Sequence, residues 1–242
     1  MNKNTLCIIP ARGGSKGVKN KNLRLIEGKS LLQLAIEEAS CSGIFNTIHV
    51  STESKIIRLE AQKLGIEFPF MRKESLATDS AHVAEVVYEV ILNYQEIGMS
   101  FNNVCLLMPT SPLRTFKHIQ HAYEMFTETE ADSLVSVSPL GKLETNLRVY
   151  KDKGLIDYYN KDIERNKNRQ NTKELYAVNG SIYFSKVHSF LKFKTFHIEN
   201  VIGYKMSSIH SVDVNTEEDL EIAKLLFKYS RLKSKEGKLW EK

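Results

Sequence analysis

A glycine-rich, cationic segment near the start of the chain has the residue types that bind phosphate. An apolar run over residues 6–10 favours a β-strand and leads into Ala11-Arg12-Gly13-Gly14-Ser15-Lys16-Gly17. Glycines let backbone N–H groups turn toward an anion, and clustered N–H groups form an anion-binding concavity. Positive charge around it comes from Arg12, Lys16, Lys19 and Lys21. The segment predicts a polyphosphate loop at the end of a strand; the alternative is a basic surface turn.

Two common phosphate-binding motifs do not fit this segment. The dinucleotide motif G-x-G-x-x-G needs a spacing that Gly13, Gly14 and Gly17 do not have. Gly28-Lys29-Ser30 imitates the end of a Walker A motif, but Leu23 stands where that motif needs its first glycine. We expect Ser30 to be the N-cap of a helix instead. A third kind of phosphate loop remains, the kind that serves in forming sugar nucleotides.

The rest of the chain alternates between strand-like and helix-like patterns. Helical periodicity is seen over residues 31–39, before Gly65, from 83 to near 98, over 115–126 and around 222–229. Strand patterns cover residues 6–10, 47–52, 66–70, 104–108, 133–138, 178–184, 201–205 and 209–214. This order predicts an α/β fold, a mostly parallel sheet with helices on both faces. Ligands of such sheets bind beyond the carboxyl ends of the strands, where the glycine-rich segment and the turn at 109–114 both lie.

The alternation stops between residues 140 and 176, where the sequence is polar and rich in Lys, Asn and Asp. A long irregular segment inside a compact domain is usually functional. We therefore predict one domain over residues 1–242 with an inserted arm at 140–176. The arm could be a lid, a disordered insertion or a segment that packs on a second subunit.

Five blocks in register resemble the acylneuraminate cytidylyltransferases, the CMP-sialic acid synthetases. The first is the glycine-rich segment with Lys21-Asn22-Leu23, and the others follow in order over residues 6 to about 226. They are Arg72 with Leu76-Ala77-Thr78-Asp79; Pro109-Thr110-Ser111-Pro112-Leu113-Arg114; Asn179-Gly180-Ser181-Ile182-Tyr183; and Asp213-Val214-Asn215-Thr216-Glu217-Glu218-Asp219-Leu220. The resemblance implies a Rossmann-like nucleotidyltransferase fold, a homodimer, and transfer of CMP from CTP to a nine-carbon keto-acid sugar with release of pyrophosphate.

The resemblance also implies which residues hold CTP. Arg12, Ser15 and Lys21 would bind the triphosphate and stabilise the leaving pyrophosphate, because phosphoryl transfer depends mainly on positioning and charge neutralisation. Arg72 and the 79–81 segment would hold cytosine and ribose. The catalytic residues implied are Arg12, Lys21 and Asp213. The full CTP-binding set is Ala11, Arg12, Gly13, Ser15, Lys16, Lys21, Asn22, Arg72, Asp79 and Ala81.

A magnesium ion is expected at Asp213. This residue follows an apolar run that we read as a strand, and an unpaired carboxylate there would be costly unless it binds a cation or a hydrogen-bond donor. Mg²⁺ prefers one or two carboxylates together with phosphate oxygens and water. Asn215 stands where the family typically has a second aspartate, so it is a weaker candidate ligand. Helix capping before Thr216 is the structural alternative, and we read the acids at 217–219 as structural.

The sugar pocket departs from the family pattern. Met108 replaces a common glutamine, and Leu143-Glu144-Thr145-Asn146 replaces a segment whose lysine binds the sugar carboxylate. The acceptor is therefore expected to be an N-acylneuraminate or a related nonulosonic acid, such as legionaminic acid. The candidate sugar-binding residues are Met108, Thr110, Arg169, Gln170, Asn179 and Tyr183. The runners-up are a nucleotidyltransferase for an eight-carbon keto-sugar and a catalytically silent nucleotide-binding protein.

Composition narrows the class of protein. The 242 residues are 42% hydrophobic and 26% charged, as expected of a globular domain, and the formal net charge is +5. No apolar run approaches the ~20 residues of a membrane span, and no basic stripe interleaved with aromatics indicates nucleic-acid binding. The three cysteines form no C-x-x-C pair. We therefore expect a cytoplasmic protein that binds neither nucleic acid nor membrane.

Overall fold

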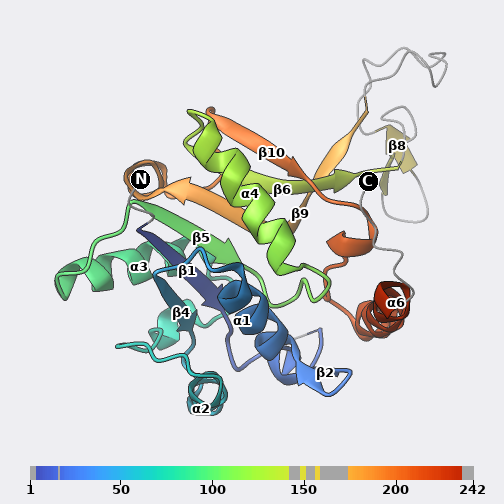
Figure 1. Cartoon of the computed structure of the whole chain (residues 1–242), viewed down its shortest axis with the longest axis horizontal. Coiled ribbons are helices and arrows are strands. Elements are labelled where there is room, and N and C mark those ends of the chain that lie inside the picture. The colour runs from blue at the N-terminus through green and yellow to red at the C-terminus, as the bar shows by residue number, and fades with distance from the viewer. Residues whose placement is uncertain (1–3, 16, 142–147, 151–155, 159–173, 236–242) are drawn as a thin grey trace.

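A computed structural model describes residues 4–15, 17–141, 148–150, 156–158 and 174–235. Its main sheet has six strands in the order β10-β6-β9-β5-β1-β4 (Figure 1). Strand β9 runs antiparallel to both β5 and β6, and the other pairs are parallel. The strands are β1 (Thr5–Pro10), β4 (Thr47–Ser51), β5 (Asn103–Leu107), β6 (Ser133–Pro139), β9 (Tyr176–Lys186) and β10 (Val201–Lys205). The predicted α/β class, with a mostly parallel sheet, is confirmed.

Helices cover both faces of this sheet. In Figure 1, α1 and α4 cross the face nearer the viewer. These two helices and α2 bury apolar side chains against one face, whereas α3 and α5 pack on the other. The helices are α1 (Leu31–Ser42), α2 (Lys55–Lys63), α3 (Val83–Glu96), α4 (Phe116–Glu128), α5 (Val187–Phe193) and α6 (Glu217–Lys235).

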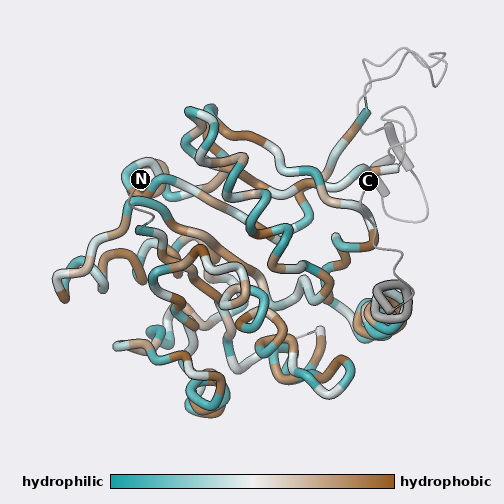
Figure 2. Tube along the Cα trace, viewed as in Figure 1, coloured by the Kyte–Doolittle hydropathy of each residue, from teal (hydrophilic) through white to brown (hydrophobic). Residues whose placement is uncertain are grey.

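Strand β1 shows why the middle of the sheet needs a continuous apolar run. Leu6 and Ile8 face the α3 side, while Cys7 and Ile9 face the α1 side, and all four are fully buried. A strand covered on both faces cannot alternate with polar residues. In Figure 2 hydrophobic and hydrophilic residues alternate along the surrounding helices, as expected where only one side of a helix is buried.

The start of α1 has the N-cap that the sequence predicts. The Ser30 hydroxyl accepts a hydrogen bond from the backbone N–H of Gln33 at 3.0 Å, which makes Ser30 the N-cap of α1. The short strands β2 (Leu25–Ile26) and β3 (Lys29–Ser30) form a hairpin just before this helix. Gly28-Lys29-Ser30 therefore belongs to a hairpin and a cap, which agrees with the rejection of a Walker motif.

Two strand predictions are wrong. Residues 66–70 form an extended loop, because Phe68 and Phe70 pack onto His49, with ring centroids 5.1 and 4.7 Å from it. Pro69 also lacks the N–H that a sheet ladder needs. Residues 209–214 contain a 3₁₀ turn (Ile209–Ser211) followed by irregular chain, so Asp213 does not end a strand.

Part of the predicted arm lies outside the described residues, namely 142–147, 151–155 and 159–173. Between these gaps, β7 (Arg148–Tyr150) and β8 (Ile156–Tyr158) pair antiparallel. The inserted arm, its role and the single domain over residues 1–242 stay predictions. Every helix in the described ranges is too short or too polar to traverse a lipid bilayer.

Candidate active site

The carboxyl ends of β1, β4 and β5 face one cavity of about 280 Å³. It lies where a nucleotide site was expected, beyond the ends of parallel strands. Segments far apart in the sequence meet there: the loop after β1, the 72–86 region, the turn after β5 and the segment before α6. The lining residues are Pro10, Arg12, Ser15, Lys21, Asn22, Arg72, Leu76, Thr78, Asp79, Ala81, Val83, Val86, Met108, Pro109, Thr110, Asp213 and Asn215.

Hydrogen bonds to its backbone fix the course of the loop after β1. The Ala11 N–H donates to the Ser51 carbonyl at 2.9 Å, which extends the ladder of β1 by one residue. The Asn22 side chain donates to the Arg12 carbonyl at 2.9 Å. The Gly13 N–H donates to the Glu53 carboxylate at 2.6 Å. Ala11 and Gly13 thus shape the loop from outside the cavity lining, and Arg12 and Ser15 line it.

Arg12 and Asp79 form an ion pair across the cavity. Both side chains are partly exposed, so water and incoming solutes can reach the pair. A pair of this kind stabilises a protein by only about 0–1 kcal/mol. The Arg12 guanidinium can therefore exchange the carboxylate for a phosphate oxygen at little cost.

Arg72 is fixed against the end of β4. Its guanidinium donates to the Ser51 carbonyl at 2.7 Å and its Nε donates to the Ser51 hydroxyl at 3.1 Å. Burial lowers the pKa of Arg72 to about 10, while Glu53 acts in the opposite direction. The side chain is therefore still cationic at neutral pH and is held rigidly at the cavity wall.

Lys21 and Asp213 are near each other in the cavity lining. The Lys21 ammonium donates to the Val214 carbonyl at 2.9 Å and to the Asn215 side-chain oxygen at 3.2 Å. Burial lowers the pKa of Lys21, and the nearby Asp213 carboxylate partly offsets this. The 213–215 segment also presses on the phosphate loop, because a Cβ at Gly17 would lie 2.2 Å from the Asn215 carbonyl oxygen. The cationic loop and Asp213 thus share one cavity.

The acids after Asn215 have structural partners, as expected. The Asp219 carboxylate accepts the backbone N–H groups of Asn215 and Thr216 at 2.9 and 2.8 Å, which caps the start of α6. Glu217 forms a two-point ion pair with Arg24, with N–O distances of 2.5 and 2.8 Å. These contacts fix the backbone that presents Asp213 to the cavity.

The turn after β5 supplies Met108 and Thr110 to the cavity lining. The Thr110 carbonyl accepts the Val214 N–H at 2.8 Å, which joins this turn to the Asp213 segment. Arg114 is buried behind the turn and donates to the carbonyls of Met108 and Ser181 at 3.0 and 2.8 Å. Arg114 therefore holds the turn in place, a role that its position in the motif did not reveal.

Two predicted sugar-binding residues do not line the cavity. The Asn179 side chain is buried between strands, where it accepts from the Ser136 hydroxyl at 2.5 Å and donates to the Ser211 hydroxyl at 2.8 Å. Tyr183 packs against Phe196, with ring centroids 5.3 Å apart. Burial raises the pKa of Tyr183, and the Asp213 charge raises it further. In this structure both residues support the site from behind.

Other predicted positions lie outside the described residues, namely Lys16, Arg169 and Gln170. Sequence reasoning also missed part of the lining. Leu76, Val83 and Val86 add apolar side chains to the cavity lining, and Thr78 adds a hydroxyl. The signal was present, since Leu76 and Thr78 belong to a motif block and Val83 opens a helix right after Asp79.

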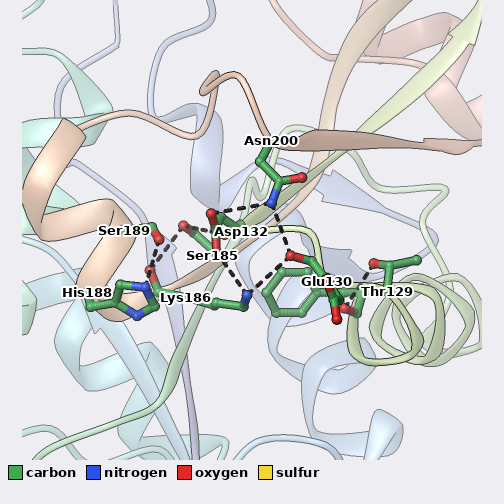
Figure 3. Close-up of polar contacts among 9 residues, drawn as sticks. Thr129, Glu130, Asp132, Ser185, Lys186, His188, Ser189 and Asn200 are labelled. Carbon is green, nitrogen blue, oxygen red and sulfur yellow. Dashed lines mark hydrogen bonds and ion pairs between the residues drawn. The ribbon is translucent and has the colours of Figure 1, made fainter.

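A second cavity of about 710 Å³ lies at the opposite end of the central strands, beside the start of β5 and the end of β9. Figure 3 shows the polar contacts next to it. Lys186 is paired with Asp132 at 2.9 Å, and Asn200 donates to the Glu130 carbonyl at 3.0 Å. These contacts tie the end of β9 to the starts of β6 and β10, so the charges there have a structural role.

Comparison with known proteins identifies the family to which this chain belongs. The sequence profile described as cytidylyltransferase matches residues 6–231. The chain belongs to the cytidylyltransferase family. The N-acylneuraminate cytidylyltransferase of Streptococcus agalactiae serotype III is 35% identical over 242 residues, covering 98% of this chain and 57% of that protein. The chain thus spans about half the length of the first curated relatives that it matches.

A second relative has a similar length to this cytidylyltransferase-family chain. The CMP-N,N'-diacetyllegionaminic acid synthase of Legionella pneumophila is 34% identical over 231 residues, covering 93% of this chain and 97% of that protein. Among solved structures, CMP:2-keto-3-deoxy-manno-octonic acid synthetase complexed with CTP superposes with a TM-score of 0.68. The superposition covers 93% of this chain and 98% of that structure. Because the two sequences are only 15% identical, the likeness supports the fold alone.

Proposed function

We propose that this chain transfers CMP from CTP to the anomeric hydroxyl of a nonulosonic acid and releases pyrophosphate. The observation that carries the proposal is the cavity in which Arg12, Lys21, Arg72 and Asp213 converge. Two arginines and a lysine are suited to bind the triphosphate and the cytosine of CTP. The single carboxylate is suited to bind a cation. The relatives that use sialic or legionaminic acid support the choice of substrate class.

The phosphate loop supplies the charge neutralisation that this reaction needs. The sugar hydroxyl oxygen bonds to the α-phosphorus while the bond from that phosphorus to the β-phosphate oxygen breaks. Negative charge then accumulates on the pyrophosphate, so cations fixed in advance stabilise the transition state more than the ground state. Arg12 and Lys21, with Ser15 between them in the lining, have this role in the proposal.

Base selection is assigned to Arg72. Its guanidinium is anchored to Ser51 through Nε and one terminal nitrogen. A fixed guanidinium can donate to the carbonyl of cytosine, and the Asp79–Ala81 side of the cavity would then meet the ribose. Anchoring matters because a rigid donor rejects a base that offers no acceptor at that point.

Asp213 and the nucleotide phosphates are the proposed ligands of Mg²⁺. Within the described ranges no three His, Cys, Asp or Glu side chains come together to hold a metal ion. The donor set nevertheless fits magnesium, which binds through one or two carboxylates together with substrate phosphates and water. When bound, the ion would neutralise phosphate charge, while Asp213 and Lys21 keep the triphosphate in position.

The apolar side of the cavity is the proposed contact for the acceptor sugar. Met108, Val83 and Val86 are apolar side chains of the cavity lining, and Thr110 lines the cavity with them. A diacetyllegionaminic acid has a second acetylamino group and a terminal methyl group where N-acetylneuraminate has hydroxyls. Those methyl groups would pack on apolar side chains, whereas the hydroxyls would be left unpaired there. This observation favours a legionaminic-type acceptor over plain N-acetylneuraminate.

We also propose a cytoplasmic homodimer. The cytoplasmic location is supported by the free thiols of Cys7, Cys41 and Cys105. The dimer is a hypothesis drawn from the family resemblance and the inserted 140–176 segment. A molar mass of two chains in light scattering would support it, and a single-chain mass would contradict it.

The test of the activity is pyrophosphate release from CTP with a panel of acceptors. The panel contains N-acetylneuraminic, legionaminic, pseudaminic and 2-keto-3-deoxy-manno-octonic acids. We expect release with at least one nine-carbon acid and more with CTP than with UTP or ATP. A folded sample that binds CTP and releases none with any acceptor would overturn the proposal and favour a silent nucleotide-binding protein.

A further inference from the structure

The side-chain amide of Asn215 hydrogen-bonds to two charged residues of the cavity lining, Lys21 and Asp213. The Asn215 Nδ2 donates to Asp213 Oδ2 at 2.7 Å, and the Asn215 Oδ1 accepts from the Lys21 ammonium at 3.2 Å. Lys21 also donates to the Val214 carbonyl at 2.9 Å. The amide N–H of Asn215 therefore faces the Asp213 carboxylate, and its amide oxygen faces the Lys21 ammonium.

The backbone of Asn215 is fixed on both sides. Its N–H donates to the Asp219 carboxylate at 2.9 Å. Its carbonyl faces Gly17 so closely that a Cβ there would come within 2.2 Å. The backbone of Asn215 is therefore held by the cap of α6 and by the glycine-rich loop, and the exposed side chain takes its direction from its hydrogen bonds to Asp213 and Lys21.

Aspartate has the same shape as asparagine, but a carboxylate oxygen replaces the amide NH₂ group, so a hydrogen-bond acceptor replaces a donor. An ionised carboxylate only accepts hydrogen bonds, so it could not donate to Asp213. Two carboxylates at the separation seen between Asn215 and Asp213 repel each other unless a cation lies between them. The choice of residue at 215 thus decides how many negative charges face the cavity.

We propose that Asn215 is a positioning residue that fixes Asp213 relative to Lys21 and limits the site to one carboxylate for a divalent cation. The inference rests on the proposed function, since the cation is expected to accompany CTP. With one carboxylate and an adjacent ammonium, the protein alone attracts a divalent cation weakly. The cation then enters together with the nucleotide, whose phosphates provide most of the negative charge.

The experiment measures Mn²⁺ binding without nucleotide, by electron paramagnetic resonance of the free ion. Three variants are compared with the wild type: Asn215→Asp, Asn215→Ala and the exchange Asp213→Asn/Asn215→Asp. We expect Asn215→Asp to bind Mn²⁺ at least tenfold more tightly, because it adds a second carboxylate. The exchange variant keeps one carboxylate and one amide, so we expect it to bind no more tightly than the wild type.

Unchanged Mn²⁺ affinity in Asn215→Asp would overturn the inference. A tenfold gain in Asn215→Ala would overturn it too, since the amide would then only block the site. The two neighbouring carboxylates could destabilise the Asn215→Asp variant in the absence of a cation. Its unfolding temperature then also reports Mn²⁺ binding, because a cation that binds only the folded state raises that temperature. That temperature should rise more steeply with Mn²⁺ than in the wild type, and an equal rise would contradict the inference.

A kinetic readout separates positioning from general stability. Asn215→Ala should raise the KM for CTP while its unfolding temperature stays near that of the wild type. An unchanged KM would count against the positioning role. Mn²⁺ binding needs neither CTP nor an acceptor, so absent turnover in the wild type would refute the proposed function without deciding this inference.

Discussion

Arg12 meets a carboxylate of its own chain in the structure, the Asp79 side chain across the cavity. The contact holds the guanidinium against another residue of the cavity lining. Because the pair is partly exposed, breaking it costs little, and a triphosphate carries more negative charge than one carboxylate. Arg12 is therefore held in place until a stronger anion arrives.

The first prediction concerns this arginine. Arg12→Ala should lower kcat/KM for CTP by about 10²–10³, the usual loss when a donor to developing charge is removed. Lys186→Ala is a matched control, because Lys186 is also a partly exposed cation paired with an acid, Asp132, but lies outside the cavity lining. We expect the control to stay within about threefold of the wild type. Steady-state kinetics on both variants would contradict the assignment if they lose activity equally.

At the scale of elements, the site depends on the fit between two loops. The glycine-rich loop leaves β1, and the 213–215 segment precedes α6, so neither is close to the other in sequence. Gly17 is where they touch most closely, because the Asn215 carbonyl occupies the space of a side chain. The two loops are thereby kept in register, and with them Arg12 and Asp213.

The second prediction tests this fit with two glycines of the same loop. Gly17→Ala should lower the free energy of unfolding by about 1–3 kcal/mol, as overpacking does. A Cβ at Gly14 meets no atom within 4 Å, so Gly14→Ala should be neutral or slightly stabilising. Denaturant unfolding without ligand measures both. Equal stabilities of the two variants would show that the loops do not press on each other.

Sequence patterns predicted the elements well where one physical cause dominates. The buried run of β1 and the capped start of α1 both follow from local residue types. Residues 66–70 alternate like a strand, yet aromatic packing onto His49 decides their course. The antiparallel place of β9 between β5 and β6 could not be predicted either, because the chain order does not fix the order of strands in a sheet.

The candidate site was predictable to a different extent. Arg12, Lys21, Arg72 and Asp213 were named from motif blocks, and they line one cavity. The same blocks predict a sugar contact for Asn179 and no role for Arg114, because a buried polar network gives no signal in a single sequence. Their roles depend on which carbonyls and hydroxyls the fold brings next to them.

At the scale of the whole molecule, a buried histidine makes stability depend on pH. His49 lies in β4 among Phe68, Phe70 and Tyr94, and its Nδ1 is 3.2 Å from the Tyr94 hydroxyl. Burial lowers its pKa from 6.5 to about 3, with a further contribution from Arg72. Between these values the unfolded chain binds a proton that the folded protein does not, so stability falls as pH falls through this window.

The third prediction follows from that sign. Between pH 6.5 and about pH 5 the wild type should lose about 2 kcal/mol more of its unfolding free energy than His49→Leu does. Phe68→Leu removes packing from the same cluster without removing a titratable group, so its curve should run parallel to the wild type. Urea unfolding across this pH range measures all three, and parallel curves for His49→Leu and the wild type would contradict the prediction.

The strand order also has a consequence while the chain is being made. β9 fills the gap between β5 and β6 but is synthesised after both of them. Until residue 186 has left the ribosome, each of those two strands has an edge with unpaired N–H and C=O groups, which can template association. At about 5–20 residues per second this state lasts on the order of 2 to 10 seconds. A chaperone, or a neighbouring nascent copy on the same messenger RNA, would have that interval in which to bind.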